Sequence, residues 1–122
     1  MTATSVDPPT SELGTVTVST SDTVVRVTAA GEVDSTSAPM LREQIDAVLD
    51  SGAPELVVDL VQVSFLDSAG LCVLAAAHRR AGERGIRMRV LASSRAVIRP
   101  LQITGLWSLL GASEVSAQSG AA

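Results

Sequence analysis

One short segment near the middle of the chain, Asp67-Ser68-Ala69-Gly70-Leu71, carries the residue types best suited to chemistry. It lies where a predicted strand and loop pass into a predicted helix, so we expect Ser68 at or near the helix N-cap. Free backbone N–H groups and the positive end of the helix dipole favour an anion at such a position. Ser68 could therefore carry a phosphate, which adds a charge of roughly −1.5 to −2. The alternative is that Asp67 and Ser68 only cap the helix.

Other arrangements of catalytic residues are missing. His78 is the only histidine and Cys72 the only cysteine, and on one helix they point about 240° apart in projection. The sequence contains no G-x-S-x-G nucleophile elbow, no glycine-rich phosphate-binding motif and no lysine, which a phosphoacceptor receiver domain would need. We therefore expect no catalytic residue, no metal site and no cofactor. Cys72 is expected to be a small buried core residue, and His78 a half-buried helix residue.

The composition excludes further classes of protein. The length of 122 residues suits one domain, and 46% of them are hydrophobic. Phe65 and Trp107 are the only aromatic residues, so stacking platforms for single-stranded nucleic acid are missing. A net charge of −4 argues against binding to a phosphate backbone. No apolar run approaches the ~18 residues of a membrane span, and the N-terminus lacks the pattern of a signal peptide. We expect a cytoplasmic protein with no direct nucleic-acid contact and no membrane span.

Alternating strand and helix patterns predict the elements that position the central segment. Strands are predicted at residues 15–19, 23–29, 56–60 and 86–91, helices at 38–49, 69–83 and 94–103, and a last short strand within 106–110. This order predicts an α/β fold, with a mixed four- to five-stranded sheet and helices packed mainly on one face. Residues 1–13 are expected to form a flexible tail, 14–111 one domain, and 112–122 a polar C-terminal tail without regular structure.

Two motifs resemble the signatures of the STAS-domain family. The first is Gly31-Glu32-Val33-Asp34 with Ser37-Ala38 and Leu41, which is similar to G-E-[LIV]-D-x-x-[ST]-A-x-x-L. The second runs from Val57-Val58-Asp59-Leu60 through Phe65-Leu66-Asp67-Ser68-Ala69-Gly70-Leu71 and is similar to V-[LV]-D-L…F-[LIM]-D-S-[STA]-G-[LI]. Ile103-Thr104-Gly105-Leu106 also resembles the family's closing segment. The resemblance covers about residues 14–110 and implies a single STAS domain.

Stand-alone STAS domains of this length are typically anti-sigma factor antagonists, and the resemblance implies that function. In the family, the unphosphorylated antagonist binds an anti-sigma factor, which then releases its sigma factor. The anti-sigma factor is also a Ser kinase that uses ATP and Mg²⁺ to phosphorylate the antagonist, and a phosphatase resets the cycle. The resemblance makes Ser68 the acceptor and assigns Asp34 to partner contact or phosphotransfer support. Asp67, Ala69 and Gly70 would complete the partner-binding surface of a protein that is a kinase substrate rather than an enzyme.

The resemblance leaves other functions open. Some small STAS proteins are accessory subunits of membrane transporters of the lipid-transport ATPase type. The sequence also departs from the family pattern, because Ala69 stands where many members have Ser or Thr, and Cys72 where Gly is common. The first difference removes a second acceptor, and the second keeps regulation by redox state as a further alternative.

Charge is distributed unevenly along the chain. Residues 1–67 contain eleven acidic residues and two arginines, whereas residues 68–122 contain two glutamates and seven arginines. We expect Asp34, Asp59 and Asp67 to gather at one end of the sheet. Five arginines should cluster around the far end of the second helix: Arg79, Arg80, Arg84, Arg87 and Arg89. This arrangement predicts an acidic docking face around Ser68.

Overall fold

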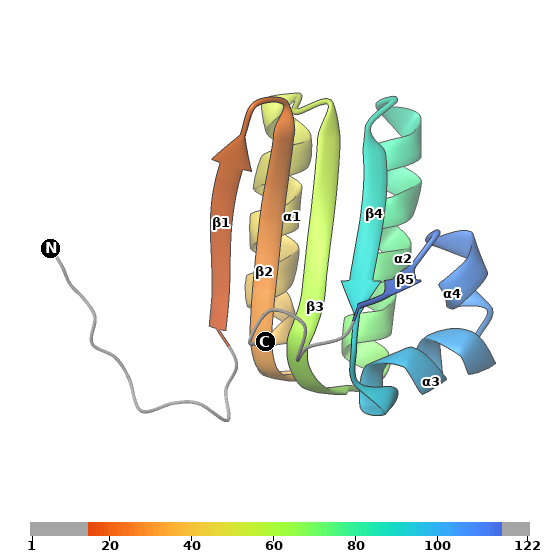
Figure 1. Ribbon diagram of the computed structural model, residues 1–122. Helices are drawn as coiled ribbons and strands as arrows, with labels where there is room; N and C mark the ends of the chain where they lie inside the picture. The colour runs from red at the N-terminus through yellow and green to blue at the C-terminus, as the bar shows by residue number, and fades with distance from the viewer. Residues whose placement is uncertain (1–14, 116–122) are drawn as a thin grey trace, which may run out of the picture.

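Within residues 15–115, which the computed structural model describes, five strands form one mixed sheet (Figure 1). The elements in chain order are β1 (Thr15–Ser21), β2 (Val24–Val33), α1 (Ala38–Ser51), β3 (Glu55–Leu66), α2 (Ser68–Glu83), β4 (Arg87–Ala92), α3 (Arg95–Ile103), α4 (Leu106–Leu109) and β5 (Ser113–Glu114). The strand order is β1-β2-β3-β4-β5, in which β1 and β2 are antiparallel and every later pair is parallel. The predicted α/β fold with a mixed sheet is confirmed.

The core lies between the sheet and the two long helices. α1 and α2 run side by side behind the strands in Figure 1, so both cover the same face, as predicted. Val27, Val58 and Val90 point from neighbouring strands into this layer and are fully buried. Leu41, Ile45 and Leu74 meet them from the helices. With two aromatic residues in the chain, aliphatic packing supplies most of the hydrophobic stabilisation, at about 25 cal/mol per Å² of apolar surface buried.

β2 and β3 are longer than the sequence predicts. The pairing of β2 with β3 has two register shifts, one between Thr28 and Ala30 and one between Gly31 and Glu32, and β3 has the extra residue each time. Both shifts are β-bulges, which break the period of two by which a strand is recognised. The stretch expected to be a short loop through Phe65-Leu66 therefore belongs to β3, which continues to the start of α2.

The C-terminal segment also differs from the prediction. The strand expected within residues 106–110 is wrong, because Leu110 N–H donates to Leu106 O at 2.8 Å and closes the single turn of α4. The last strand lies further on, at β5, where Val115 N–H donates to Ala92 O at 2.7 Å beyond the ladder with β4. The expected tail at 1–13 lies outside the described residues, as do residues 116–122 of the expected C-terminal tail.

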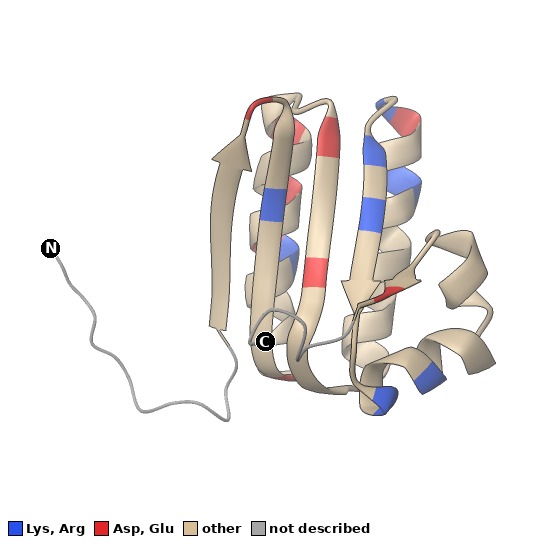
Figure 2. Cartoon of the chain, in the orientation of Figure 1, with Lys and Arg blue, Asp and Glu red and all other residues tan. Residues whose placement is uncertain are grey.

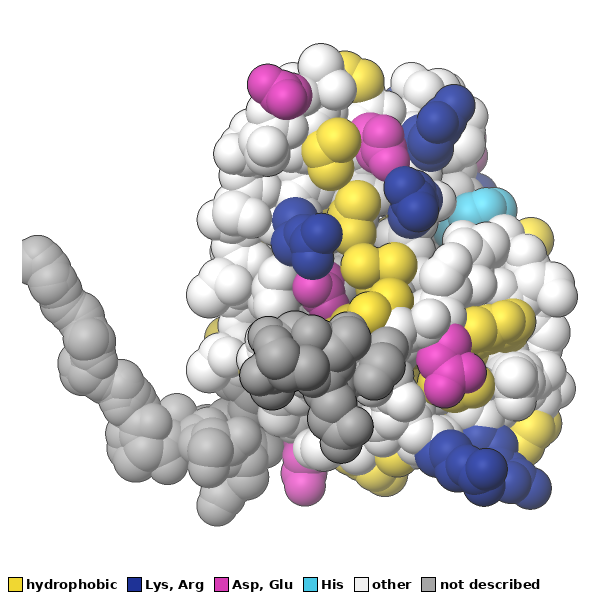
Figure 3. Space-filling view, in the orientation of Figure 1, with side chains coloured by type: hydrophobic (Ala, Val, Ile, Leu, Met, Phe, Trp, Pro, Cys, Tyr) yellow, Lys and Arg dark blue, Asp and Glu magenta, His cyan; other side chains and the backbone are white. Residues whose placement is uncertain are grey.

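The second face of the sheet carries ion pairs instead of helices. Asp59 follows the core residue Val58 on β3 and so points to the opposite face, where its Oδ2 accepts from Arg26 Nη1 at 2.7 Å. Arg89 on β4 lies 3.7 Å from Glu55. Figures 2 and 3 show this face, with arginines on β2 and β4 on either side of the acidic residues of β3. The expectation that Asp59 lies at the end of the sheet is wrong, because the bulges extend β3 beyond it.

Ion pairs also connect the two long helices. Arg80 on α2 donates to Asp46 on α1, and Arg84 donates to Asp50 at 2.5 Å. The hydrogen bond from Arg84, together with the charges of Arg84 and Arg80, lowers the pKa of Asp50 below its ordinary value. Acidic residues of the first half of the chain are thus paired with arginines of the second half.

We predict that Arg84→Gln raises the pKa of Asp50 toward the ordinary value of an aspartate. A lowered folded-state pKa gives a contribution to stability that is present above the unfolded-state pKa and is lost as the pH falls through the folded-state value. The variant should therefore lose the contribution that the Arg84–Asp50 pair makes to the free energy of unfolding above the pKa of Asp50. NMR titration of the Asp50 carboxyl carbon measures the shift. Arg87→Gln is the control, since Arg87 makes no ion pair with any described residue; equal titration in all three proteins would contradict the prediction.

Candidate functional site

The two sequence motifs meet at one end of the sheet. Val33 pairs with Leu66 at the carboxyl ends of the parallel strands β2 and β3. Just beyond this pair, Asp67 N–H donates to Val33 O at 3.1 Å. Asp34 follows Val33 and Ser68 follows Asp67, so the topology places both motif residues on neighbouring connections at the same edge.

Asp67, rather than Ser68, is the N-cap of α2. One carboxylate oxygen of Asp67 accepts from Ala69 N–H at 2.9 Å and from Gly70 N–H at 3.3 Å. Two of the N–H groups expected to be free for an anion are thus already bonded. Ser68 is the first residue of the helix, its side chain is exposed, and its hydroxyl makes no hydrogen bond with any described residue. The capping alternative is therefore correct for Asp67, and the Ser68 hydroxyl takes no part in the cap.

Gly70 lets α2 pack closely against the sheet. A Cβ atom at this position would overlap Leu66 Cδ1 and would lie 3.0 Å from Val33 Cγ1. Both neighbours are buried, at 3% exposure each, so they have little room to move. Gly70 is itself buried. The surface expected to include Gly70 can therefore use only its backbone, and its role in the fold is the close approach.

Asp34 organises the turn that leads into α1. Its Oδ1 accepts from Thr36 N–H at 2.9 Å and from Ser37 N–H at 3.2 Å. The buried Ser37 hydroxyl donates to Glu32 O at 2.7 Å and accepts from Asp34 N–H at 3.0 Å. These bonds explain Asp34 and Ser37 of the first motif by local structure, and they hold Asp34 half-buried.

Two grooves lie on either side of Ser68. One, of about 420 Å³, runs between the starts of α1 and α2 and includes Ala69, Cys72 and Arg42 in its lining. The other, of about 620 Å³, lies between the end of β3 and α3 and is mainly apolar; its lining is Phe65, Leu66, Arg95, Ala96, Arg99, Pro100, Ile103 and Thr104. Leu66 lines one groove and Ala69 the other, so the exposed Ser68 lies in the chain between a residue of each groove.

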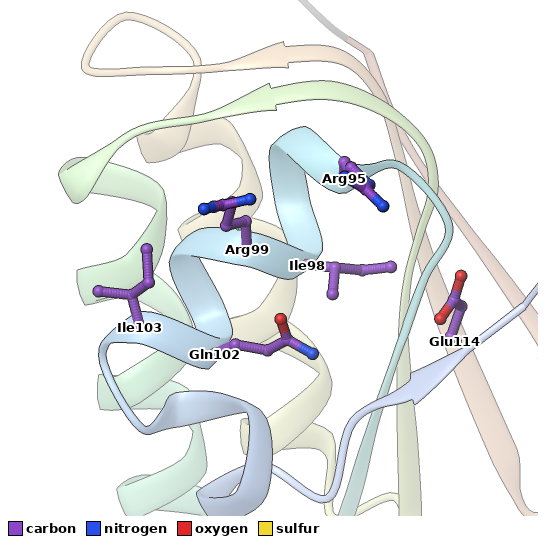
Figure 4. A pocket seen from close by; sticks show the side chains of 6 residues that line it. All are labelled: Arg95, Ile98, Arg99, Gln102, Ile103 and Glu114. Atoms are coloured by element: carbon purple, nitrogen blue, oxygen red, sulfur yellow. The ribbon is translucent and has the colours of Figure 1, made fainter.

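α3 presents arginines at this end of the molecule. In Figure 4, Arg99 and Ile103 point to one side of α3, whereas Ile98 and Gln102 point toward Glu114 on β5. Ile103 is 75% exposed and Phe65 45% exposed, so the groove beside Ser68 combines open apolar side chains with two guanidinium groups.

The expected acidic docking face is therefore wrong. Arg80 and Arg84 do lie away from Ser68, paired with α1, and Arg89 pairs with β3. Arg95 and Arg99, however, line the groove next to Phe65, and Asp59 lies on the open face of the sheet. Asp34 and Asp67 remain, so the end of the molecule at Ser68 carries charges of both signs.

Cys72 differs from its prediction as well. It was expected in the core, but its side chain is exposed on the wall of the groove between α1 and α2. The positions of α2 that face the core are Leu74, Ala77 and Ala81. His78 is half-buried, as predicted.

The described residues contain no cluster that resembles a metal centre. Within residues 15–115, no group of three or more His, Cys, Asp or Glu side chains could hold a metal ion. In the same part of the chain, none of the helices is long and apolar enough to cross a membrane.

Comparison with known proteins decides the family. The family model described as "Mlab, STAS domain" matches residues 16–111. The chain belongs to the STAS-domain family. Both signature motifs of this STAS domain lie inside the matched range. They come together at the end of the sheet where Asp34 and Ser68 lie on neighbouring connections.

The relatives of this STAS domain are named as anti-sigma factor antagonists. The anti-sigma-B factor antagonist of Bacillus subtilis is 34% identical over 85% of this chain and 92% of its own length. The anti-sigma-F factor antagonist RsfB of Mycobacterium tuberculosis is 36% identical over 75% of each chain. The crystal structure of an anti-sigma factor antagonist from Mycobacterium paratuberculosis has a TM-score of 0.76 and 37% identity, and the match covers 81% of this chain and 84% of that one. By homology, this STAS domain is a member of the anti-sigma factor antagonist group.

The groove beside α3 was missed by sequence reasoning. The sequence feature that could have revealed this groove is the spacing of Arg95, Arg99 and Ile103. These residues recur every four positions on one face of α3. The buried positions of this helix are Val97, Ile98 and Leu101, so Ile103 is an apolar residue off the core stripe. Ile103 and the exposed Phe65 line the same groove, and exposed apolar residues that gather in this way indicate a binding surface.

We predict that Gly70→Ala destabilises the STAS domain by about 1–3 kcal/mol, because the added methyl group overpacks the contact with Leu66 and Val33. Gly82→Ala on the same helix is the matched control, since a Cβ there meets nothing within 4 Å. This control should gain up to about 1 kcal/mol from helix propensity. Urea unfolding measures both free energies, and equal effects of the two substitutions would contradict the close approach.

We predict that Asp67→Ala lowers the free energy of unfolding by about 1 kcal/mol, because Ala69 and Gly70 lose the side-chain acceptor of their N–H groups. Asp67→Asn keeps an N-cap acceptor and should leave stability nearly unchanged. The same urea measurement tests both variants. A large loss in Asp67→Asn would show that the carboxylate charge, and not the cap, stabilises the start of α2.

Proposed function

We propose that the protein is an anti-sigma factor antagonist that is switched by phosphorylation of Ser68. In its unphosphorylated form it binds an anti-sigma factor that has Ser kinase activity, and that partner then releases its sigma factor. The single observation that carries this proposal is the position of Ser68: exposed, without a hydrogen bond among the described residues, and in the chain between Leu66 and Ala69, which line two different grooves.

Ser68 suits the role of phosphoryl acceptor. Its hydroxyl does not have to break a bond within the described structure before a kinase can take it up, and the first turn of α2 fixes its direction. In the transfer, the Oγ–P bond forms, the bond between the γ-phosphorus and the bridging oxygen of ATP breaks, and the hydroxyl proton leaves to a base of the kinase. The kinase supplies ATP and Mg²⁺, so the antagonist itself needs no cofactor.

The phosphate would change the docking surface by its charge. The N–H groups of Ala69 and Gly70 already donate to the Asp67 carboxylate, so a phosphate on Ser68 cannot become their acceptor without breaking the cap. It would also lie next to that negative carboxylate, which favours an outward position in solvent. A partner that covers both grooves would then have to bury roughly two negative charges, and the cost of removing them from water opposes binding.

The grooves indicate the chemistry of the partner surface. Phe65 and Ile103 offer apolar contacts, while Arg95 and Arg99 favour carboxylates at the edge of the same groove. We therefore infer that the anti-sigma factor contributes an apolar side chain flanked by acidic groups. Asp34 and Asp67 would contact the partner next to Ser68, as would Ala69 in the lining of the groove between α1 and α2. A phosphatase would remove the phosphate and restore binding.

The decisive experiment combines phosphate mapping with affinity. Incubation with the cognate kinase and ATP should place the phosphate on Ser68 by mass spectrometry, and Ser68→Ala should abolish it. Ser68→Asp should weaken binding of the anti-sigma factor at least tenfold, about 1.4 kcal/mol. Thr23→Asp is the control of equal charge, because Thr23 lies in the β1–β2 turn at the opposite end of the sheet.

Two results would overturn the proposal. Phosphorylation of Ser68→Ala to the wild-type level would remove Ser68 as the acceptor, and unchanged affinity in Ser68→Asp would remove charge as the switch. A pull-down that recovers a transporter ATPase subunit and no anti-sigma factor would favour the accessory-subunit function instead.

A further inference from the structure

We infer that two copies of this chain associate through the outer edge of β1 and the adjoining flank of α1, forming a symmetric dimer with one continuous sheet. The proposal concerns a surface away from Ser68 and does not depend on the proposed function. It begins from the sheet order, in which β1 is terminal and its outer edge has no strand partner within residues 15–115.

β1 lacks the features that usually protect an edge strand. Such strands avoid pairing with another chain by short length, charged side chains, proline or a bulge. β1 has seven residues, Thr15-Val16-Thr17-Val18-Ser19-Thr20-Ser21, with neither charge nor proline, and its register with β2 is continuous. Val18 is 43% exposed, although it lies opposite the core residue Val27.

The opposite edge of the sheet provides an internal comparison. β5 pairs with β4 only at Leu91 and Ala92, which leaves the first four residues of β4 without an outer strand partner. That free stretch contains Arg87 and Arg89, both exposed. Two guanidinium groups in a short segment oppose pairing with a second copy, so charge protects this edge, whereas no residue of β1 carries a charge.

The flank of α1 beside β1 is also uncharged. On a wheel of 100° per residue, the ion pairs to α2 mark one side of α1 at Asp46 and Asp50, and the buried residues mark the core side. The side toward β1 carries Gln44 and Ser51, and Met40 and Ala47 follow them toward solvent; all four are uncharged. Met40 is 41% exposed. The charges of α1 thus lie on the α2 side and, with Glu43, toward solvent.

This surface is complementary to itself. An antiparallel pair of β1 strands uses all seven residues when Val18 faces Val18 of the second copy, which places the two-fold axis there. Val16 then faces Thr20 and Thr17 faces Ser19, all of them uncharged pairs and mostly β-branched. Two chains that each carry a net charge of −4 can meet at this surface without placing like charges opposite each other.

The size of the surface predicts a weak dimer. β1 is about 24 Å long and α1 about 21 Å, and the strand edge plus the helix flank are about 15 Å across. Two such patches bury on the order of 700–1,000 Å² in total, which is below the range of standard stable interfaces and typical of transient association. The dimer should therefore form at high protein concentration and dissociate on dilution.

Sedimentation velocity of the full chain over a concentration series tests the proposal. We expect the mass to rise from that of one chain toward that of two. Val18→Lys and Gln44→Arg should each raise the dissociation constant at least tenfold, because each places a like charge beside its symmetry mate. Leu109→Lys is the matched control, since Leu109 is 55% exposed on α4, away from β1, and should leave the dimer intact.

Cross-linking tests the register. In a Cys72→Ala background, which removes the exposed native thiol, Val18→Cys should form an intermolecular disulfide on mild oxidation, because facing Cβ atoms lie about 4.5–5.5 Å apart. Thr15→Cys should not, since its symmetry mate would be about 20 Å away.

Three outcomes would overturn the inference. The first is a full chain that stays at the mass of one copy at every concentration. The second is self-association that persists in both Val18→Lys and Gln44→Arg. The third is dimerisation only after residues 1–12 are deleted, which would assign the edge of β1 to the chain's own N-terminal segment.

Discussion

The close approach of α2 to the ends of β2 and β3 is the constraint on which the site depends. Gly70 allows this approach because it has no Cβ, and any larger residue would meet the buried side chains of Leu66 and Val33. With the helix held this near, Asp67 can cap α2 with its carboxylate while its own N–H donates to Val33 O. The backbone and the side chain of Asp67 thus join α2 to the sheet. This junction sets the position of Ser68, the next residue.

The sequence predicted the elements well wherever the apolar period was regular. α1 and α2 follow a helical stripe, and β1 and β4 alternate cleanly. β3 could not be read in the same way, because its buried residues Leu60, Val63 and Leu66 recur every three positions. A spacing of three is neither a strand period nor a helix period, and it arises because a bulge adds one residue to each interval. Asp59 was misplaced for this reason. Its Oδ1 accepts from Val61 N–H at 3.0 Å next to the first bulge, a local role that no composition pattern reveals.

The sequence predicted where the motif residues lie in the fold better than it predicted their surroundings. The motifs identified Asp34, Asp67 and Ser68 and the edge of the sheet that they share. They could not show that Cys72 is exposed, because the rotation of α2 about its axis depends on contacts with the sheet. Nor could the charge count along the chain locate the arginines. Arg80 and Arg84 are paired across 34 residues with α1, whereas Arg95 and Arg99 reach the end of the molecule at Ser68 through the position of α3.

These contacts also bear on how a phosphate at Ser68 would act. A switch by conformational change needs a second arrangement that the modified form stabilises over the first. Around Ser68, the cap of α2, the bond to Val33 and the buried Gly70 all fix one arrangement, and the first-turn N–H groups that could reorganise around a phosphate already have an acceptor. Moving α2 would break the cap and expose the contact of Leu66 with Val33, whereas leaving α2 in place keeps both and lets the phosphate point into solvent, away from the Asp67 carboxylate. The rigid junction therefore favours a switch that works at the surface, by adding charge where a partner must dock, with the fold beneath it unchanged.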